Sequence, residues 1–202
     1  MVVTSLAQSS ARVLTLIGLM LLCGTLSACI NQAGNANPYR AYAVTGEQID
    51  SANRQGLPYV KNRRGHLQTI KPVDFQTEQF GLVRILPNYV SDGSSRPFDS
   101  DHGSNMAALL HDALYRGAPQ LTFPDGYPGR WTRQQADAAF CRQLRIQKAT
   151  PTNQTINCKA LNLMGVSHGV WKYHTKKRKA YWKTQEERLR KKRVNRLFIS
   201  PS

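Results

Sequence analysis

The sequence has no long hydrophobic run. The longest, residues 13–23, spans 11 residues, whereas a helix that crosses a membrane needs about 20. A run of this length is typical of the apolar core of an export signal, which has roughly 7–15 residues. The residues before it are polar and carry one charge, Arg12. We therefore expect residues 1–28 to be a signal peptide and no segment to span a bilayer.

Acidic residues are also scarce, with 12 Asp and Glu against 28 Lys and Arg, a net charge of +16. Removing Arg12 with the signal leaves 27 basic residues against 12 acidic ones, or +15. Residues 172–196 hold 12 of the basic residues and only two acidic ones. We expect residues 172–202 to form a basic helical tail that binds anionic lipids or envelope polymers. The export signal argues against nucleic acid as the partner.

The predicted signal ends in Leu26-Ser27-Ala28-Cys29, which resembles the lipobox of bacterial lipoproteins. The resemblance implies that Cys29 is diacylated and becomes the N-terminus. Ile30, where some lipoproteins have Asp, implies the outer membrane. Two acyl chains give stable anchoring without a spanning helix. We therefore expect a lipid-anchored protein of the bacterial cell envelope that faces the periplasm. The alternative is an ordinary secretory signal with a chance cysteine.

Cysteine is rare, with four residues in the chain. Cys23 would leave with the signal and Cys29 would carry the lipid, so only Cys141 and Cys158 remain. In an oxidising periplasm this pair predicts a disulfide. Two unpaired buried thiols are the alternative. The sequence also lacks Cys-x-x-Cys pairs and His-x-x-x-His spacing, which disfavours a zinc hydrolase. It has no glycine-rich phosphate loop either.

Polarity and spacing predict an α+β fold, mainly α, in which a small antiparallel β-sheet precedes an antiparallel helix pair and further C-terminal helices. We expect a tether over residues 29–65, with a short helix near 46–53, and one globular domain over 66–171. The expected strands are His66–Ile70, Asp74–Gln79 and Leu82–Leu86, and the expected helices are Ser104–Arg116, one starting at the Thr132 capping box, and Gln154–Val170.

The residues that could carry chemistry centre on His111 and Asp112. Adjacent residues on a helix diverge by about 100°, so Asp112 cannot easily orient His111. Tyr115, four residues on, shares the face of His111. An antiparallel pairing with the next helix would bring Asp137 against one ring nitrogen, which leaves the other nitrogen to act as a general base on water. Asp112 would then be free to bind a hard cation.

The turn that begins at Asp92 could supply further oxygen ligands to that cation. Backbone carbonyls and carboxylates are the ligands that calcium prefers. Asp92 is therefore a candidate calcium ligand together with Asp112. Alternatively, Asp92 only caps a turn.

Two family resemblances cover this region. Residues 74–175, about half the chain, resemble domain-of-unknown-function family 1353 of bacterial and phage-associated proteins, a family with no settled activity. The matching pieces are Asp92-Gly93-Ser94-Ser95-Arg96-Pro97, the segment from Ala107 to Arg116, the segment from Arg133 to Phe140, Gly165 and Trp171.

The second resemblance is to phospholipases of the A2 type, and it lies in His111-Asp112-x-x-Tyr115 followed by Ala136-Asp137-x-x-Phe140. It implies that His111 is the base, that Asp112 binds calcium, that Asp137 orients His111, and that Tyr115 belongs to the same catalytic core. The dense disulfide framework of the secreted enzymes is absent here. The glycine-rich calcium loop is matched only loosely, by residues 89–93.

These observations leave two hypotheses from different classes. The first is a calcium-dependent esterase that acts on lipid esters in the envelope. The second is a non-catalytic envelope or phage-derived interaction protein, in which the His-Asp residues form a structural polar core and the basic tail binds an anionic surface. The sequence predicts no oligomeric state.

Overall fold

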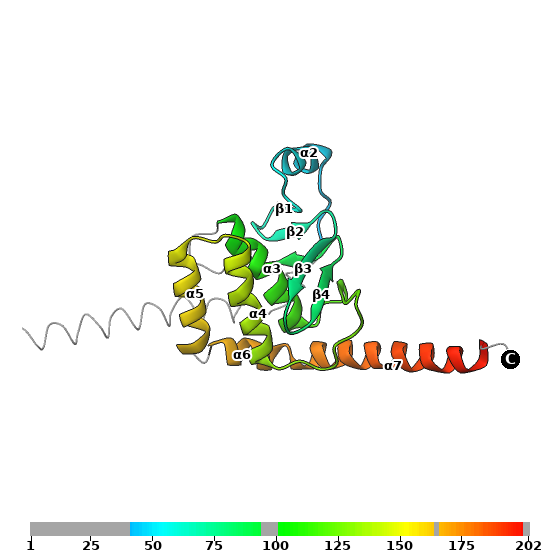
Figure 1. The fold of residues 1–202 in the computed structure, drawn as a ribbon. Helices are drawn as coiled ribbons and strands as arrows, with labels where there is room; N and C mark the ends of the chain where they lie inside the picture. The colour runs from blue at the N-terminus through cyan, green and yellow to red at the C-terminus, as the bar shows by residue number, and fades with distance from the viewer. Residues whose placement is uncertain (1–40, 94–100, 164–165, 200–202) are drawn as a thin grey trace, which may run out of the picture. The chain divides into compact units, whose positions relative to one another are not determined.

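The structure is a computed structural model that describes residues 41–93, 101–163 and 166–199 (Figure 1). The predicted signal peptide, Cys29 and the turn residues 94–97 lie outside the described residues. The described residues from 41 onward form one compact unit. Its elements are α2 (Gly46–Arg54), β1 (Tyr59–Lys61), β2 (Leu67–Thr69), β3 (Val73–Thr77), β4 (Gly81–Ile85), β5 (Val90–Ser91), α3 (His102–Arg116), β6 (Leu121–Thr122), α4 (Arg133–Ile146), α5 (Pro151–Leu163), α6 (Val166–Tyr173) and α7 (Thr175–Ile199).

The strands form two small antiparallel sheets of three strands each, in the orders β1-β2-β5 and β3-β4-β6. In β3 the buried residues Val73, Phe75 and Thr77 alternate with exposed ones, as expected for a strand with one face on the core. The helices that follow make the fold α+β and mainly α, as the sequence predicted. The three predicted strands correspond to β2, β3 and β4 within two residues at each end.

Helices α3 and α4 pack as an antiparallel pair. At one end Tyr115 of α3 contacts Asp137 in the first turns of α4. At the other end Gly103, in the first turn of α3, lies so close to the residues after α4 that a Cβ there would be 2.5 Å from the Ala149 nitrogen. Only glycine permits this approach. The buried interface between these ends is formed by Ala107, Ala108, Phe140 and Leu144.

Both helices begin at the caps that the residues provide. The Asp101 carboxylate accepts the Ser104 backbone N–H at 2.6 Å and caps α3. Thr132 and Gln135 form the predicted capping box at the start of α4. Because the caps define where each helix starts, they also determine which side chains of the pair face each other.

The third predicted helix, Gln154–Val170, is wrong as a single element. The chain instead forms α5 and α6, which end and begin on either side of residues 164–165. Helix α5 starts earlier than expected, at Pro151, because proline is favoured in the first helical turn, where its missing N–H has no partner to lose.

The predicted boundary of the tether at residue 65 is too late. Helix α2 has its own capping box at Thr45 and Gln48, and β1 pairs in register with β2. Tyr59 and Val60 are buried, so the chain before residue 66 already contributes to the core. Residues 30–65 contain few large apolar side chains, so their composition did not predict that Tyr59 and Val60 are buried.

The first part of the predicted basic tail, residues 172–202, packs against the globular domain. Arg178 and Tyr181 on α7 are buried, and the Tyr181 hydroxyl donates to the Leu121 carbonyl at 2.8 Å. Gly117, which ends α3 in the left-handed region with φ 58°, lies against α7: a Cβ there would be 2.8 Å from Arg178 Cα. The first two turns of α7 therefore belong to the domain.

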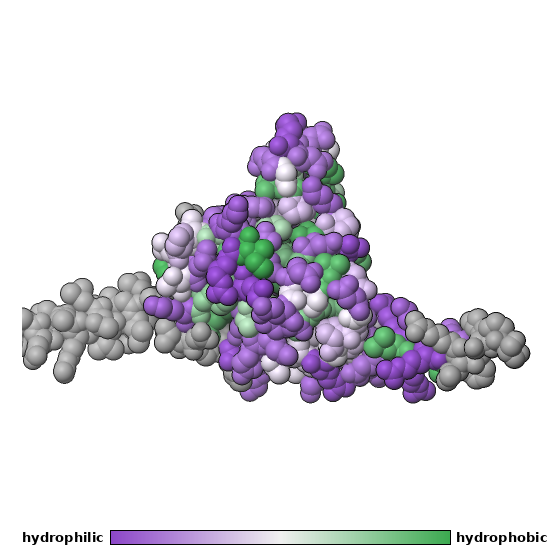
Figure 2. Space-filling view, in the orientation of Figure 1, coloured by the Kyte–Doolittle hydropathy of each residue, from purple (hydrophilic) through white to green (hydrophobic). Residues whose placement is uncertain are grey.

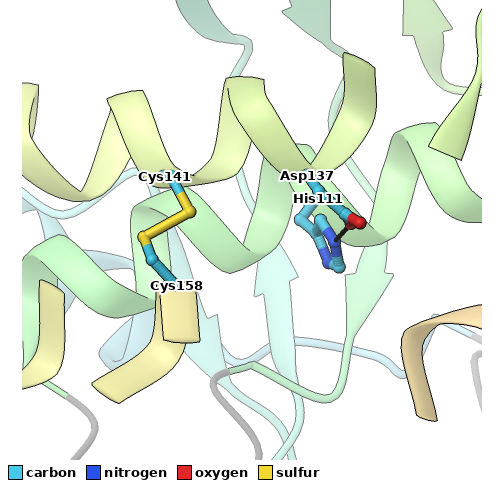
Figure 3. The surroundings of a disulfide bond; sticks show 4 residues. All are labelled: His111, Asp137, Cys141 and Cys158. Atoms are coloured by element: carbon cyan, nitrogen blue, oxygen red, sulfur yellow. Dashed lines mark hydrogen bonds and ion pairs between the residues drawn. A yellow bond between two sulfur atoms is a disulfide. The ribbon is translucent and has the colours of Figure 1, made fainter. Parts of the chain in front are cut away.

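A disulfide joins Cys141 on α4 to Cys158 on α5, with the two Cα atoms 5.6 Å apart (Figure 3). This confirms the predicted pair. The link closes a loop of 17 residues, for which the loss of entropy in the unfolded chain predicts a stabilisation of about 3 kcal/mol. It holds α5 against the helix that carries Asp137.

Among the helices in the described part of the chain, none is long and apolar enough to cross a membrane. Helix α7 has 25 residues, but its exposed part is basic rather than apolar.

Candidate functional site

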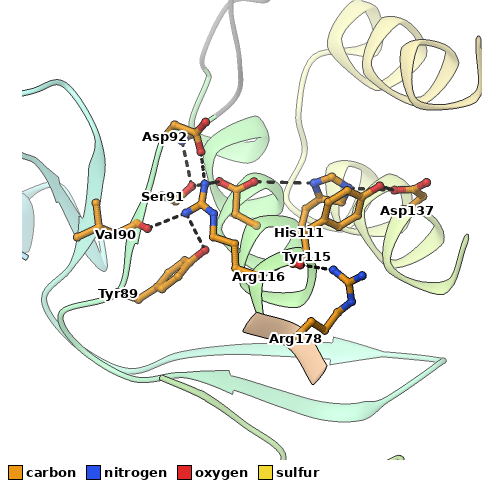
Figure 4. A network of polar contacts seen from close by, with 11 residues as sticks. Tyr89, Val90, Ser91, Asp92, His111, Tyr115, Arg116, Asp137 and Arg178 are labelled. Atoms are coloured by element: carbon orange, nitrogen blue, oxygen red, sulfur yellow. Dashed lines mark hydrogen bonds and ion pairs between the residues drawn. The ribbon is translucent and has the colours of Figure 1, made fainter. Parts of the chain in front are cut away.

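The candidate site centres on the carboxylate of Asp137, one turn into α4. His111 Nε2 lies 3.0 Å from Asp137 Oδ1, and the Tyr115 hydroxyl donates to the same oxygen (Figure 4). Arg133 Nη1 donates to the other oxygen, Oδ2, at 3.0 Å. A carboxylate only accepts hydrogen bonds, so this contact favours the His111 tautomer that carries its proton on Nε2. The pairing of His111 with Asp137 that the sequence predicted is present.

Two aromatic rings pack against the His111 ring. Its centroid lies 4.1 Å from that of Tyr115 and 4.8 Å from that of Phe140. The side chain is 13 % exposed, so it is largely buried but still reaches solvent. Its second nitrogen, Nδ1, lies 4.0 Å from Asp112 Oδ1, a separation that a water molecule in contact with both atoms can bridge.

Asp112 belongs to a second group of polar contacts on the other side of His111. Its Oδ2 accepts the Ser91 hydroxyl at 2.5 Å and Arg116 Nη2 at 3.2 Å. Arg116 Nη2 also donates to Asp92 Oδ1 at 2.5 Å, and Nη1 donates to the Val90 carbonyl at 2.9 Å. Asp92 and Asp112, the two predicted calcium ligands, are therefore brought together, but around a guanidinium group.

The two carboxyl groups have opposite pKa directions. Burial first, and then the nearby charge of Asp92, raise the pKa of Asp112 well above its ordinary value. Burial alone would raise the pKa of Asp92 as well, but the charge of Arg116 and hydrogen bonds from Asp112 and the backbone together lower it. Of the two carboxyl groups, Asp112 is therefore the one that takes up a proton more readily.

Calcium fits this arrangement poorly. A calcium ion takes six to eight oxygen ligands and favours ionised carboxylates. Here burial disfavours the ionised form of Asp112, and Arg116 already occupies the oxygens of Asp92, Asp112 and Val90. Among the residues that the structure describes, no three His, Cys, Asp or Glu side chains gather as a metal-binding group. Calcium stays a prediction from the family resemblance, and we derive no step through it.

Helix α7 contacts the site through the side chain of Arg178. Arg178 is 1 % exposed, and its Nη1 donates to the Tyr115 carbonyl at 2.6 Å. Its guanidinium also lies 3.3 Å from the ring centroid of Trp171, a cation–π contact. Burial lowers the pKa of Arg178 to about 10, which leaves it charged at neutral pH. The basic helix is thus tied to the end of α3 that carries Tyr115.

The sequence predicted His111, Tyr115, Asp112, Asp92 and Asp137, and all five lie in one connected network. Among the members of the network that were not predicted are Arg116, Arg133 and Ser91. The two arginines lie four residues from Asp112 and Asp137 on the same helices, so helical spacing carried a signal for them. Ser91 lies within the segment 89–93 that loosely matches the calcium loop, but its own contact with Asp112 depends on the tertiary packing of β5 against α3.

One further pentapeptide, Gly165-Val166-Ser167-His168-Gly169, has the Gly-x-Ser-x-Gly spacing of a nucleophile elbow. That motif requires a strand before the serine and a helix after it. Here the preceding element is helix α5, and Ser167 lies within α6. The order of elements does not fit the elbow, so the spacing is not evidence for a serine hydrolase.

The chain matches no family model, no curated protein and no solved structure. The resemblances to domain-of-unknown-function family 1353 and to phospholipases of the A2 type therefore stay predictions that rest on the residues quoted for them.

His174, at the junction of α6 and α7, predicts how stability depends on pH. Burial, followed by the positive charges of Arg116, Lys177 and Arg178, lowers the pKa of His174 to about 4, against the opposing effect of Asp92. Its ordinary value is 6.5, so the unfolded chain binds the proton first as the pH falls. The contribution of neutral His174 to stability is complete above pH 6.5 and is lost as the pH falls toward 4.

We expect His174→Phe, which keeps the ring but cannot take up a proton, to flatten the fall in unfolding free energy between about pH 6.5 and 4. Denaturant unfolding across this range measures the effect. The exposed His102→Asn is the control, which should keep the wild-type profile. A His174→Phe protein with the full wild-type pH dependence would show that another group is responsible.

Proposed function

We propose that the protein is an envelope lipoprotein that hydrolyses the acyl ester bonds of lipids, with His111 as general base and Asp137 as the carboxylate that orients it. The observation that carries the proposal is the contact of 3.0 Å between His111 Nε2 and Asp137 Oδ1. Tyr115 and Arg133 hold the same carboxylate, so the base is oriented by a group that is itself fixed. Cys29 would anchor the protein at the surface that contains its substrate.

In this mechanism His111 Nδ1 takes a proton from water while the water oxygen attacks the acyl carbonyl carbon. The tetrahedral intermediate then collapses, the bond between the acyl carbon and the alcohol oxygen breaks, and the proton returns from His111 to the leaving alcohol. The products are a fatty acid and a lysolipid. The Asp137 carboxylate stabilises the imidazolium that forms in the course of the reaction, as a buried carboxylate does in other His-dependent hydrolases.

Asp112 has a supporting role in this proposal. Its Oδ1 lies 4.0 Å from the nitrogen that would act as base, and its other oxygen is held by Ser91 and Arg116. A water bound between Asp112 and His111 would be close to the base. The carboxyl group can therefore position the water while His111 removes its proton.

A second candidate function, without catalysis, is the binding of an anionic lipid surface by α7. The part of α7 that follows Tyr181 is largely exposed to solvent. Figure 2 shows most of its visible surface as hydrophilic. The exposed basic residues with described side chains in this part of the helix are Lys183, Arg188, Arg190, Lys191, Lys192 and Arg193. Opposite charges are few: Glu186 already pairs with Arg130, and Glu187 lies 4.0 Å from Lys183. The described side chains in this part of the helix form no apolar face that could insert between lipids, so its binding would be electrostatic.

The catalytic proposal predicts that His111→Asn abolishes most hydrolysis of phospholipid vesicles, with a loss of about 10²–10⁴-fold, the usual worth of a general base. Asp137→Asn should also lower the rate, because it loses the charge that stabilises imidazolium. The assay is the release of fatty acid by the chain from residue 29 onward with Cys29→Ser, and thermal melts on each variant check the fold.

The matched control is His102→Asn, which changes an exposed histidine on the same helix and should leave the rate unchanged. Wild-type protein that releases no fatty acid from any phospholipid, together with a lower melting temperature for His111→Asn, would overturn the catalytic proposal. That result would leave His111 and Asp137 as a structural pair.

The second candidate predicts that changing the six exposed basic residues of α7 named above to glutamine weakens binding to anionic vesicles, by up to about 1 kcal/mol for each charge that lies near the surface. Wild-type binding should fall as salt rises from about 0.05 to 0.5 M, because screening shortens the reach of the charges. Vesicle co-sedimentation of the unlipidated protein measures both effects.

A control variant with the same net charge separates local from overall electrostatics. It changes six exposed basic residues outside α7 to glutamine: Arg54, Lys61, Arg63, Lys71, Arg145 and Lys148. This control should bind more tightly than the α7 variant. Equal binding by the two variants would mean that α7 is not the binding surface.

A further inference from the structure

Four oxygen-bearing groups converge on the guanidinium of Arg116, and one of them is the Tyr89 hydroxyl, which accepts from Nη1 at 3.4 Å. Nη2 lies 2.5 Å from Asp92 Oδ1 and 3.2 Å from Asp112 Oδ2, and Nη1 lies 2.9 Å from the Val90 carbonyl oxygen (Figure 4). Carboxylates and backbone carbonyls are the ligands that calcium prefers. A cation that belongs to the chain itself therefore lies at the point on which these oxygens converge.

Arg116 is built into this position. It follows Asp112 by four residues on α3, which places the two side chains on one face of the helix. Its side chain is only 10 % exposed, and its planar guanidinium is always charged and can donate to several oxygens at once. Because it is part of the chain, it does not depend on an ion being available in solution.

Arg116 and a calcium ion exclude each other here. An ion bound to the oxygens of Asp92 and Asp112 would lie 2.3–2.6 Å from each, as calcium does in proteins, and thus in the space of the guanidinium. If Arg116 stayed beside it, the two cations would repel each other, and burial of the Arg116 and Asp112 side chains limits the screening by solvent. Calcium could bind only if Arg116 left and both carboxyl groups were ionised.

We propose that Arg116 takes the place of a metal ion in this site, so that the protein binds no calcium at Asp92 and Asp112 and its hydrolysis needs none. Arg116 is then a positioning residue: it holds Asp112 by Oδ2 and leaves Oδ1 4.0 Å from His111 Nδ1. The statement about hydrolysis rests on the proposed function, whereas the statement about cation occupancy does not.

The test removes the internal cation and asks whether calcium replaces it. In chelator, Arg116→Met should melt below wild type because two carboxyl groups are left without their positive partner. Weak calcium sites in proteins have a Kd of about 10⁻⁴–10⁻³ M. With such an affinity for the Arg116→Met variant, about 10 mM calcium should raise its melting temperature by about 3 °C or more. Wild type should show no such rise, and isothermal titration with calcium should give heat of binding only for the variant.

Matched variants connect the response to this site. Arg84→Met removes the arginine of an exposed Arg–Asp pair, with Asp74, and should gain no calcium response. Adding Asp112→Asn to Arg116→Met should abolish the response. Arg116→Gln, which keeps hydrogen-bond donors, is measured in parallel in case the methionine variant does not fold.

Two results would overturn the inference. The first is binding of calcium by wild type that Asp112→Asn removes, which would mean that Arg116 moves aside for the ion. The second is the lack of a calcium response in both neutral variants of Arg116, which would mean that the oxygens form no cation site.

The statement that hydrolysis needs no calcium is tested separately, by measuring the release of fatty acid. Fatty acid release by wild type should be unchanged, within about twofold, between chelator and calcium. A rate that requires calcium would overturn the proposal that the site works without metal. Absence of any hydrolysis would count against the proposed function alone, since the melts and titrations decide the occupancy of the cation position without an activity measurement.

Discussion

The Asp137 carboxylate is the group on which the candidate site depends. It lies near the start of α4, where it accepts His111, Tyr115 and Arg133 together. A buried carboxylate is costly unless its oxygens are hydrogen-bonded, and here both are. Its position follows from the antiparallel packing of α3 and α4, which the close approach at Gly103 permits and the disulfide reinforces. Loss of this packing would separate the base from the group that orients it.

A second cation–anion group lies on the other side of His111, around Arg116. The two groups meet at the imidazole, whose nitrogens face Asp137 and Asp112. Arg178 then ties the backbone of Tyr115 to the basic helix. The site and the surface proposed to bind anionic lipid are therefore parts of one packed unit, which would keep the base at a constant distance from a lipid surface bound by α7.

Most of the fold was predictable because it follows from local patterns. Alternation gave β2, β3 and β4, the cap at Thr132 gave the start of α4, and the spacing of His111 and Tyr115 placed them on one helical face. The errors have physical causes. Tyr59 is buried by tertiary packing, since it joins the main core cluster and its hydroxyl contacts His102, 43 residues away in the sequence. Arg178 is buried because Gly117 leaves room for α7. The sequence did not predict that Arg116 pairs with the two carboxyl groups, because an oppositely charged i, i+4 pair on a helix is more often exposed to solvent than buried.

The central claim is that His111 activates water to cleave the acyl ester bond of a lipid. Hydrolysis of phospholipid vesicles in water enriched in oxygen-18, with mass spectrometry of both products, tests this claim most directly. Because water attacks the acyl carbon, the account predicts one labelled oxygen in the carboxyl group of the released fatty acid and none in the lysolipid. Label in the phosphate-containing product, or no release of fatty acid at all, would contradict it.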